Sequence, residues 1–141
     1  MRRIIGTVLL VGGLGGCLGQ RTLLAQACQD DEEMSKTTLK DVTDLVGTIK
    51  KESLGDFEKA YHQKSYVSKA GFSLTVISGL VSCLDKAAQD SAASKEQADA
   101  YKAKRDSYAK LKDKIEQSRS AVKSAEQKDA KALIEKADLS G

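Results

Sequence analysis

The sequence predicts an all-α protein, an antiparallel up-and-down bundle of four helices that follows an N-terminal export signal. Three observations support this prediction. The 141-residue chain contains no proline, the residue that most strongly interrupts helices. Its apolar residues recur at helical spacings of three and four along much of the chain. Runs that alternate apolar and polar residues, as strands do, are almost absent.

The first part of the chain is typical of an export signal. Met1-Arg2-Arg3 forms a basic start, and an uncharged, glycine-rich apolar run follows from Ile4 to Leu18. This run has about 15 residues, fewer than the ~20 that cross a bilayer comfortably. A basic start, a short apolar run and a small-residue exit together indicate secretion.

Two cleavage sites follow from the residues at the exit. Ala25-Gln26-Ala27 is an A-x-A site, and cleavage after Ala27 makes Cys28 the mature N-terminus. We predict this site. Leu14-Gly15-Gly16-Cys17 resembles a bacterial lipobox, which would make Cys17 a lipidated first residue, and an uncleaved anchor is a third reading. The predicted domains are a signal over residues 1–27, an acidic flexible leader over 28–36 and a helical bundle over 37–138.

The charge balance argues against nucleic-acid binding. The whole chain has 23 Lys and Arg against 20 Asp and Glu, but three of the arginines lie before residue 28. The chain from Cys28 onward therefore carries equal numbers of basic and acidic residues. Nonspecific binding to nucleic acid needs clustered positive charge, which this balance does not provide.

Helical periodicity first appears after the acidic run Asp30 to Glu33. One face carries Leu39, Val42, Leu45, Val46 and Ile49. We expect Thr37 or Thr38 to cap this helix and Ser53-Leu54-Gly55 to end or kink it. A short second helix is expected around Phe57, Ala60 and Tyr61.

The most apolar segment, Ala70 to Leu84, is predicted to be the core helix. Its expected centre is Phe72, Ile77, Leu80, Val81 and Leu84, facing Leu45, Val46, Ile49 and the Tyr108, Leu111 and Ile115 stripe. The small residues Gly71, Ser78, Gly79 and Ser82 would allow another helix to approach closely.

A turn over Gln89 to Ser94 separates this segment from the last helical region. Ser94 and Gln97 form a pattern typical of a capping box. The residues Tyr101, Tyr108, Ile115 and Val122 then recur at intervals of seven on one stripe. Either one helix runs from 95 to 137, or a break near 118–128 releases a final short helix.

The residues predict no catalytic, cofactor-binding or metal-ligating site, so we expect no enzyme. His62 is the sole histidine, and because it has no nearby cysteine and no evident carboxylate triad we expect it to be a surface histidine. Cys83 lies among apolar residues and is expected to be a buried, inert thiol, although pairing with Cys28 in an oxidising compartment is an open alternative. Tyr101 and Tyr108 are expected at the edge of the core.

Several segments resemble the small lumenal four-helix proteins of photosystem II. Within 61–88, Val67-Ser68, Phe72 to Thr75 and Gly79-Leu80 resemble the central helix of the assembly and repair factor family, which is a lipoprotein in cyanobacteria. The run from Tyr108 to Ala125-Glu126 resembles its last helix, and Leu39 to Lys51 its first. Leu84 to Ala88 and Ala100-Tyr101 are more remotely similar to the extrinsic Q subunit.

This chain also departs from the assembly-factor pattern. His62-Gln63-Lys64 stands where that family has paired arginines, and Asp85-Lys86-Ala87 where it has Gly-His-Tyr. Ser91 to Gln97 replaces a proline-containing loop.

The resemblance implies an exported accessory protein without a cofactor, docking on a membrane protein complex in the thylakoid lumen or a periplasm-like compartment. Peripheral membrane association is compatible with this function. The alternative is an independent secreted or surface module that binds another protein. The sequence does not point to the docking residues or to an oligomeric state.

Overall fold

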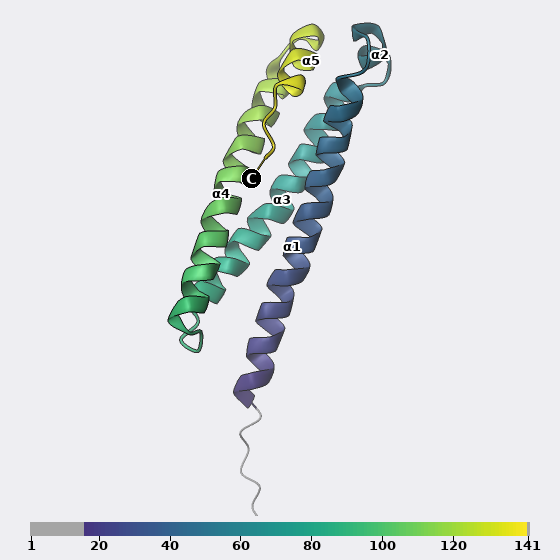
Figure 1. Ribbon diagram of the computed structural model, residues 1–141. Helices are drawn as coiled ribbons and strands as arrows, with labels where there is room; N and C mark the ends of the chain where they lie inside the picture. Colours follow the sequence, from purple (N-terminus) through teal and green to yellow (C-terminus); the bar gives the residue numbers. More distant parts are fainter. Residues whose placement is uncertain (1–15, 141) are drawn as a thin grey trace, which may run out of the picture.

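The computed structural model describes residues 16–140 and the side chains of residues 28–140. Within this range the chain is helical without strands, which confirms the predicted all-α class (Figure 1). The helices are α1 (Gly16–Ile49), α2 (Leu54–Lys59), α3 (His62–Gln89), α4 (Lys95–Ser124) and α5 (Gln127–Glu135). The predicted basic start and most of the apolar signal run lie outside the described residues, as does the side chain of Cys17.

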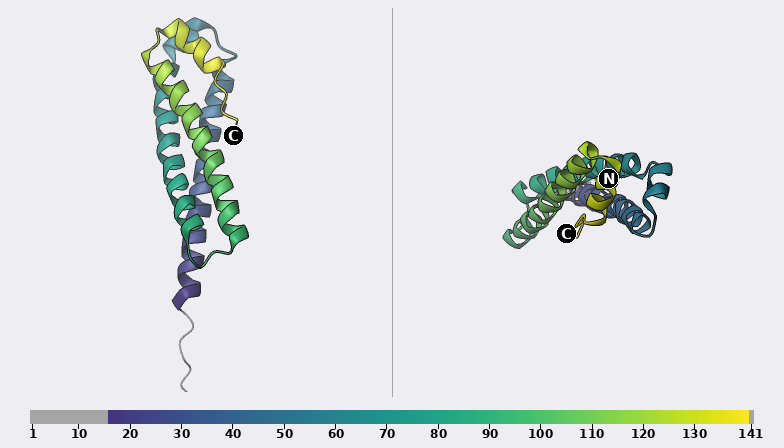
Figure 2. Two further views of the ribbon diagram at one scale, coloured as in Figure 1. Left: turned by 90° about the vertical axis from the view of Figure 1, so that its left-hand side faces the viewer. Right: turned by 90° about the horizontal axis from the view of Figure 1, so that it is seen from above.

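Three long antiparallel helices form the body of the molecule. Helix α3 packs against both α1 and α4, while α5 folds back and contacts α4, α1 and α3 (Figures 1 and 2). The short helix α2 forms the corner between α1 and α3. The bundle is therefore asymmetric, because α5 is much shorter than the three helices it joins.

The core consists of two buried clusters that follow one another along α3. The larger cluster joins all five helices and contains Val42, Val46, Ile49, Phe57, Tyr66, Ala70, Ile77, Leu111, Ile115, Val122, Ala130 and Ile134. The smaller cluster contains Cys28, Leu80, Leu84 and Ala87. Tyr101 and Tyr108 pack at the edge of the smaller cluster, as predicted.

Helix α1 begins far earlier than predicted, so the flexible leader over 28–36 is wrong. Residues 28–36 are helical, and neither Thr37 nor Thr38 caps a helix start. Cys28, Ser35 and Thr38 are buried, and the Thr38 hydroxyl donates to the Ser35 carbonyl over 3.1 Å. Small polar side chains thus take core positions, and of the acidic residues between them Asp30 and Glu33 are exposed.

The predicted centre of α3 is correct except at Phe72. Ile77, Leu80 and Leu84 are buried and Val81 is partly buried, but the Phe72 side chain is 60% exposed. The buried residues of α3 follow one stripe with spacings of three and four, and Phe72 points about 120° away from it. No other described helix covers that side.

Local hydrogen bonds and backbone conformation define where the helices begin and end. The Ser94 hydroxyl accepts from Gln97 N over 3.2 Å while Ser94 N donates to Gln97 Oε1 over 2.9 Å, which confirms the predicted capping box. Of the two readings for residues 95–137, the structure has the break: Ala125 is extended between α4 and α5. At the other corner, Tyr61 has a positive φ of 54° just before α3.

Candidate docking surface

One surface of α3 carries neither charge nor a covering helix. Five exposed residues at helical spacings of three and four define it, and we call them the uncharged face of α3: Ser68, Phe72, Thr75, Gly79 and Ser82. Helix α3 is the one helix among the described residues that is long and apolar enough to cross a membrane, with a mean hydropathy of 1.5. Only 28% of its apolar window is buried within the molecule. Most of that window is therefore partly or fully exposed rather than buried.

A groove of about 860 Å³ adjoins this face between α3 and α4. We call it the α3–α4 groove; it is lined by Gln63, Lys64, Val67, Ser68, Gly71, Phe72, Leu74, Thr75, Arg119 and Lys123. Its volume lies within the ~300–1,000 Å³ typical of ligand pockets. The groove and the uncharged face share Ser68, Phe72 and Thr75, so they form one continuous surface.

Arg119 lies across α3 because Gly71 leaves room for it. The Nε of Arg119 donates a hydrogen bond to the Val67 carbonyl over 3.0 Å. A Cβ atom at residue 71 would stand 3.0 Å from the same nitrogen, tighter than ordinary contact. The predicted close approach at Gly71 is therefore made by a guanidinium group, and this contact fixes the cation in the groove wall.

Gln63 joins the start of α3 to the end of α4. Its side-chain Nε2 donates to the Val122 carbonyl over 2.8 Å and to the Ala125 carbonyl over 2.9 Å. Carbonyls at a helix end have no partner within the helix, so these bonds satisfy them. They also hold Lys123, in the last turn of α4, beside the start of α3.

The groove is positively charged. Lys64, Arg119 and Lys123 line it, and no acidic side chain does. The Lys64 ammonium lies 5.7 Å from the centre of the Tyr61 ring, a cation–π contact. Among the described residues, none of these three cations forms an ion pair within 4.0 Å.

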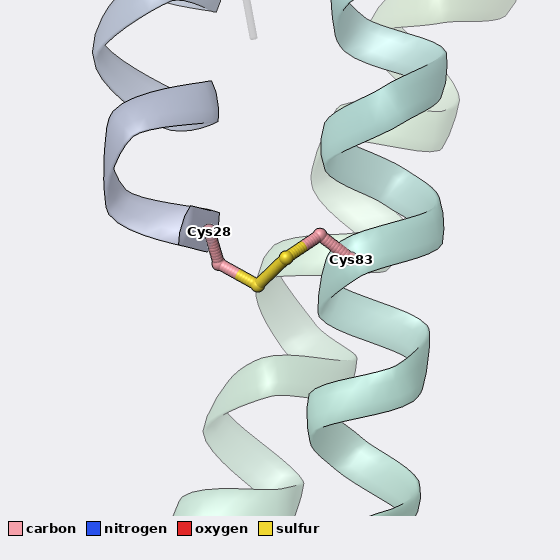
Figure 3. The surroundings of a disulfide bond; sticks show 2 residues. All are labelled: Cys28 and Cys83. Atoms are coloured by element: carbon pink, nitrogen blue, oxygen red, sulfur yellow. A yellow bond between two sulfur atoms is a disulfide. The ribbon is translucent and has the colours of Figure 1, made fainter. Parts of the chain in front are cut away.

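A disulfide joins the two cysteines whose side chains the structure describes. Cys28 on α1 and Cys83 on α3 are bonded with their Cα atoms 5.6 Å apart (Figure 3). The prediction of an inert Cys83 thiol is therefore wrong, and the alternative pairing is correct. The acidic residues after Cys28 predict a flexible leader there, whereas Cys28 lies on the core-facing side of α1.

His62 has a carboxylate neighbour that its sequence surroundings hide. Its Nε2 lies 2.8 Å from Glu52 Oε2, and its side chain is only 14% exposed. The corner formed by α2 brings these residues together across a separation of ten positions. His62 is therefore mostly buried at the corner of the bundle beside Glu52, rather than the surface histidine we expected.

Charged residues also tie α1 to α4. Glu32 lies 2.7 Å from Lys104 and 2.9 Å from Lys36, and hydrogen bonds from these two ammonium groups lower the pKa of the Glu32 carboxyl. Burial raises the pKa of the Tyr108 phenol at the same interface. Among the described residues, no group of three or more His, Cys, Asp or Glu is placed to hold a metal ion.

The comparisons with known proteins found no match. It matches no protein-family model, no curated protein and no solved structure. The similarity to the lumenal proteins of photosystem II therefore stays a prediction from residues 39–51, 61–88 and 108–126.

Proposed function

We propose that this protein is an exported, non-enzymatic accessory protein that docks on a larger membrane complex through the uncharged face of α3. The observation that carries the proposal is the exposure of that face: Phe72 is 60% exposed on the most apolar helix of the molecule. Burying an exposed aromatic side chain against a partner is favourable by roughly 25 cal/mol per Å² of apolar area.

The disulfide supports the exported location. Structural disulfides persist in oxidising compartments and are rare in the cytosol. Cys28 and Cys83 are separated by 55 residues and are held on two different helices, so their bond is part of the fold. It agrees with the export signal expected over residues 1–27.

Site-specific crosslinking in the organism that encodes the protein tests the docking. Phe72 is replaced by the photoreactive amino acid p-benzoylphenylalanine, and cells are irradiated before lysis. We expect a covalent adduct with a subunit of a membrane complex. The control places the same group at Lys110, an exposed position on α4 outside the groove. Equal adduct yields at the two positions, or none at residue 72, would overturn the proposal.

The resemblance makes photosystem II one specific candidate for the complex. If the protein assembles with or stabilises photosystem II, the native protein co-purifies with thylakoid membranes and the adduct contains a photosystem subunit. Recovery from the culture medium alone would instead favour the secreted interaction module.

A further inference from the structure

The α3–α4 groove gives the docking surface a chemical preference at one end. Its three cations have no acidic neighbour in the groove wall, and none of them forms an ion pair within 4.0 Å with the described residues. The bond from Arg119 to the Val67 carbonyl uses its Nε. Its two terminal nitrogens form no hydrogen bond with the described residues and remain donors for a further group.

The remainder of the surface fits an α-helix. The uncharged face extends over 15 residues, which is about 21 Å of helix at 1.5 Å per residue. Apart from Phe72 its side chains are small, and a Cβ atom at Gly79 would meet nothing within 4 Å. Small residues let two helix backbones approach closely, and Phe72 supplies a single apolar anchor.

From these observations, and resting on the docking function proposed above, we infer that the docked segment is an amphipathic helix of a protein partner whose acidic side chains meet Lys64, Arg119 and Lys123. Its apolar side packs along the uncharged face of α3. Carboxylates suit the groove because an arginine held by Nε presents its other donors to an acidic group.

A protein partner fits these charges better than an anionic bilayer does. Binding to an anionic bilayer typically uses clusters of four to eight basic residues, whereas this groove holds three. The chain from residue 28 onward has as many acidic as basic residues, so the molecule as a whole is not drawn to a negative surface.

The test reverses the charge of the two exposed lysines of the groove, Lys64 and Lys123, in the full chain that carries the crosslinker at residue 72. We expect Lys64→Glu with Lys123→Glu to lower the adduct yield about tenfold, since like charges then face one another. Lys110→Glu, the matched control on α4, should leave the yield unchanged. The milder pair Lys64→Gln with Lys123→Gln should give an intermediate yield, and circular dichroism checks that each variant is folded.

A second measurement uses a synthetic peptide with the sequence of the partner segment that is crosslinked to residue 72. Fluorescence anisotropy should show binding that weakens in high salt, and replacing the peptide's Asp and Glu by Asn and Gln should weaken it by about tenfold. An unchanged adduct yield in the Lys64→Glu/Lys123→Glu chain would overturn the acidic helix while leaving docking intact. Adducts with lipid, together with binding to phosphatidylglycerol vesicles, would overturn it in favour of a membrane surface. If the chain with an unaltered groove gave no adduct at residue 72, docking itself would be overturned.

Discussion

Leu80 and Phe72 are large apolar residues eight positions apart on one helix with opposite surroundings. Leu80 is fully buried against α1 and α4, so Leu80→Ala should lower the free energy of unfolding by about 2–5 kcal/mol. Phe72→Ala removes an exposed side chain and should cost less than about 1 kcal/mol. Urea denaturation of the two variants measures the difference. Similar midpoints for both would mean that α3 is oriented differently in solution.

The buried and exposed sides of α3 show how far residue types alone could predict this surface. Spacing correctly located Ile77, Leu80 and Leu84 in the core, because they are apolar and recur on one stripe. It failed at Phe72, since hydrophobicity alone cannot tell a buried apolar residue from an exposed one. Nor could it show that Arg119 would occupy the space above Gly71, because that contact joins residues 48 positions apart.

At the scale of elements, the disulfide ties the early turns of α1 to α3. Replacing both Cys28 and Cys83 by serine should lower the free energy of unfolding by about 2–4 kcal/mol, because the bond closes a loop of 55 residues. Hydrogen exchange should increase most around residues 28–35, where packing on α3 is held by this bond. The control is dithiothreitol, which should destabilise the unaltered protein and leave the double variant unchanged. Equal exchange in both proteins would show that packing alone holds α1.

The early start of α1 could not be predicted from the sequence, for a physical reason. Its buried stripe passes through Cys28, Ser35, Thr38 and Val42 at spacings of seven, three and four, and two of these side chains carry hydroxyls. The hydrophobicity pattern therefore indicates an acidic, polar segment, whereas the structure has a packed helix face there. The break between α4 and α5 was equally hard to fix, because the bonds that stabilise it come from Gln63 on α3.

For the whole molecule, two acidic contacts make stability depend on pH. Lys104 and Lys36 lower the pKa of Glu32, and hydrogen bonds from Ser140 and Lys114 lower the pKa of Asp138 to about 2. The unfolded chain then binds protons at higher pH than the folded chain, so stability is lost as pH falls. We expect the urea midpoint to decrease from pH 5 to pH 2.

A substitution at the contact between α1 and α4 tests that dependence. Glu32→Gln removes one of the two groups and should flatten the pH profile. Glu33→Gln, at the exposed neighbouring position, should keep the profile of the unaltered protein. A profile that is equally steep in both variants would place the acid sensitivity elsewhere.

The disulfide described above also divides the polypeptide into a covalent ring and an appendage. The ring contains most of α1, all of α2 and most of α3, whereas α4 and α5 are attached only through residues 90–94. A single proteolytic cut at 50–53 leaves both fragments joined until a reductant is added. A cut at 90–94 breaks the only covalent link between the ring and helices α4 and α5, whether or not a reductant is present. The α3–α4 groove lies across this boundary, with Lys64 in the ring and Arg119 in the appendage, so after the second cut packing alone keeps its cations together.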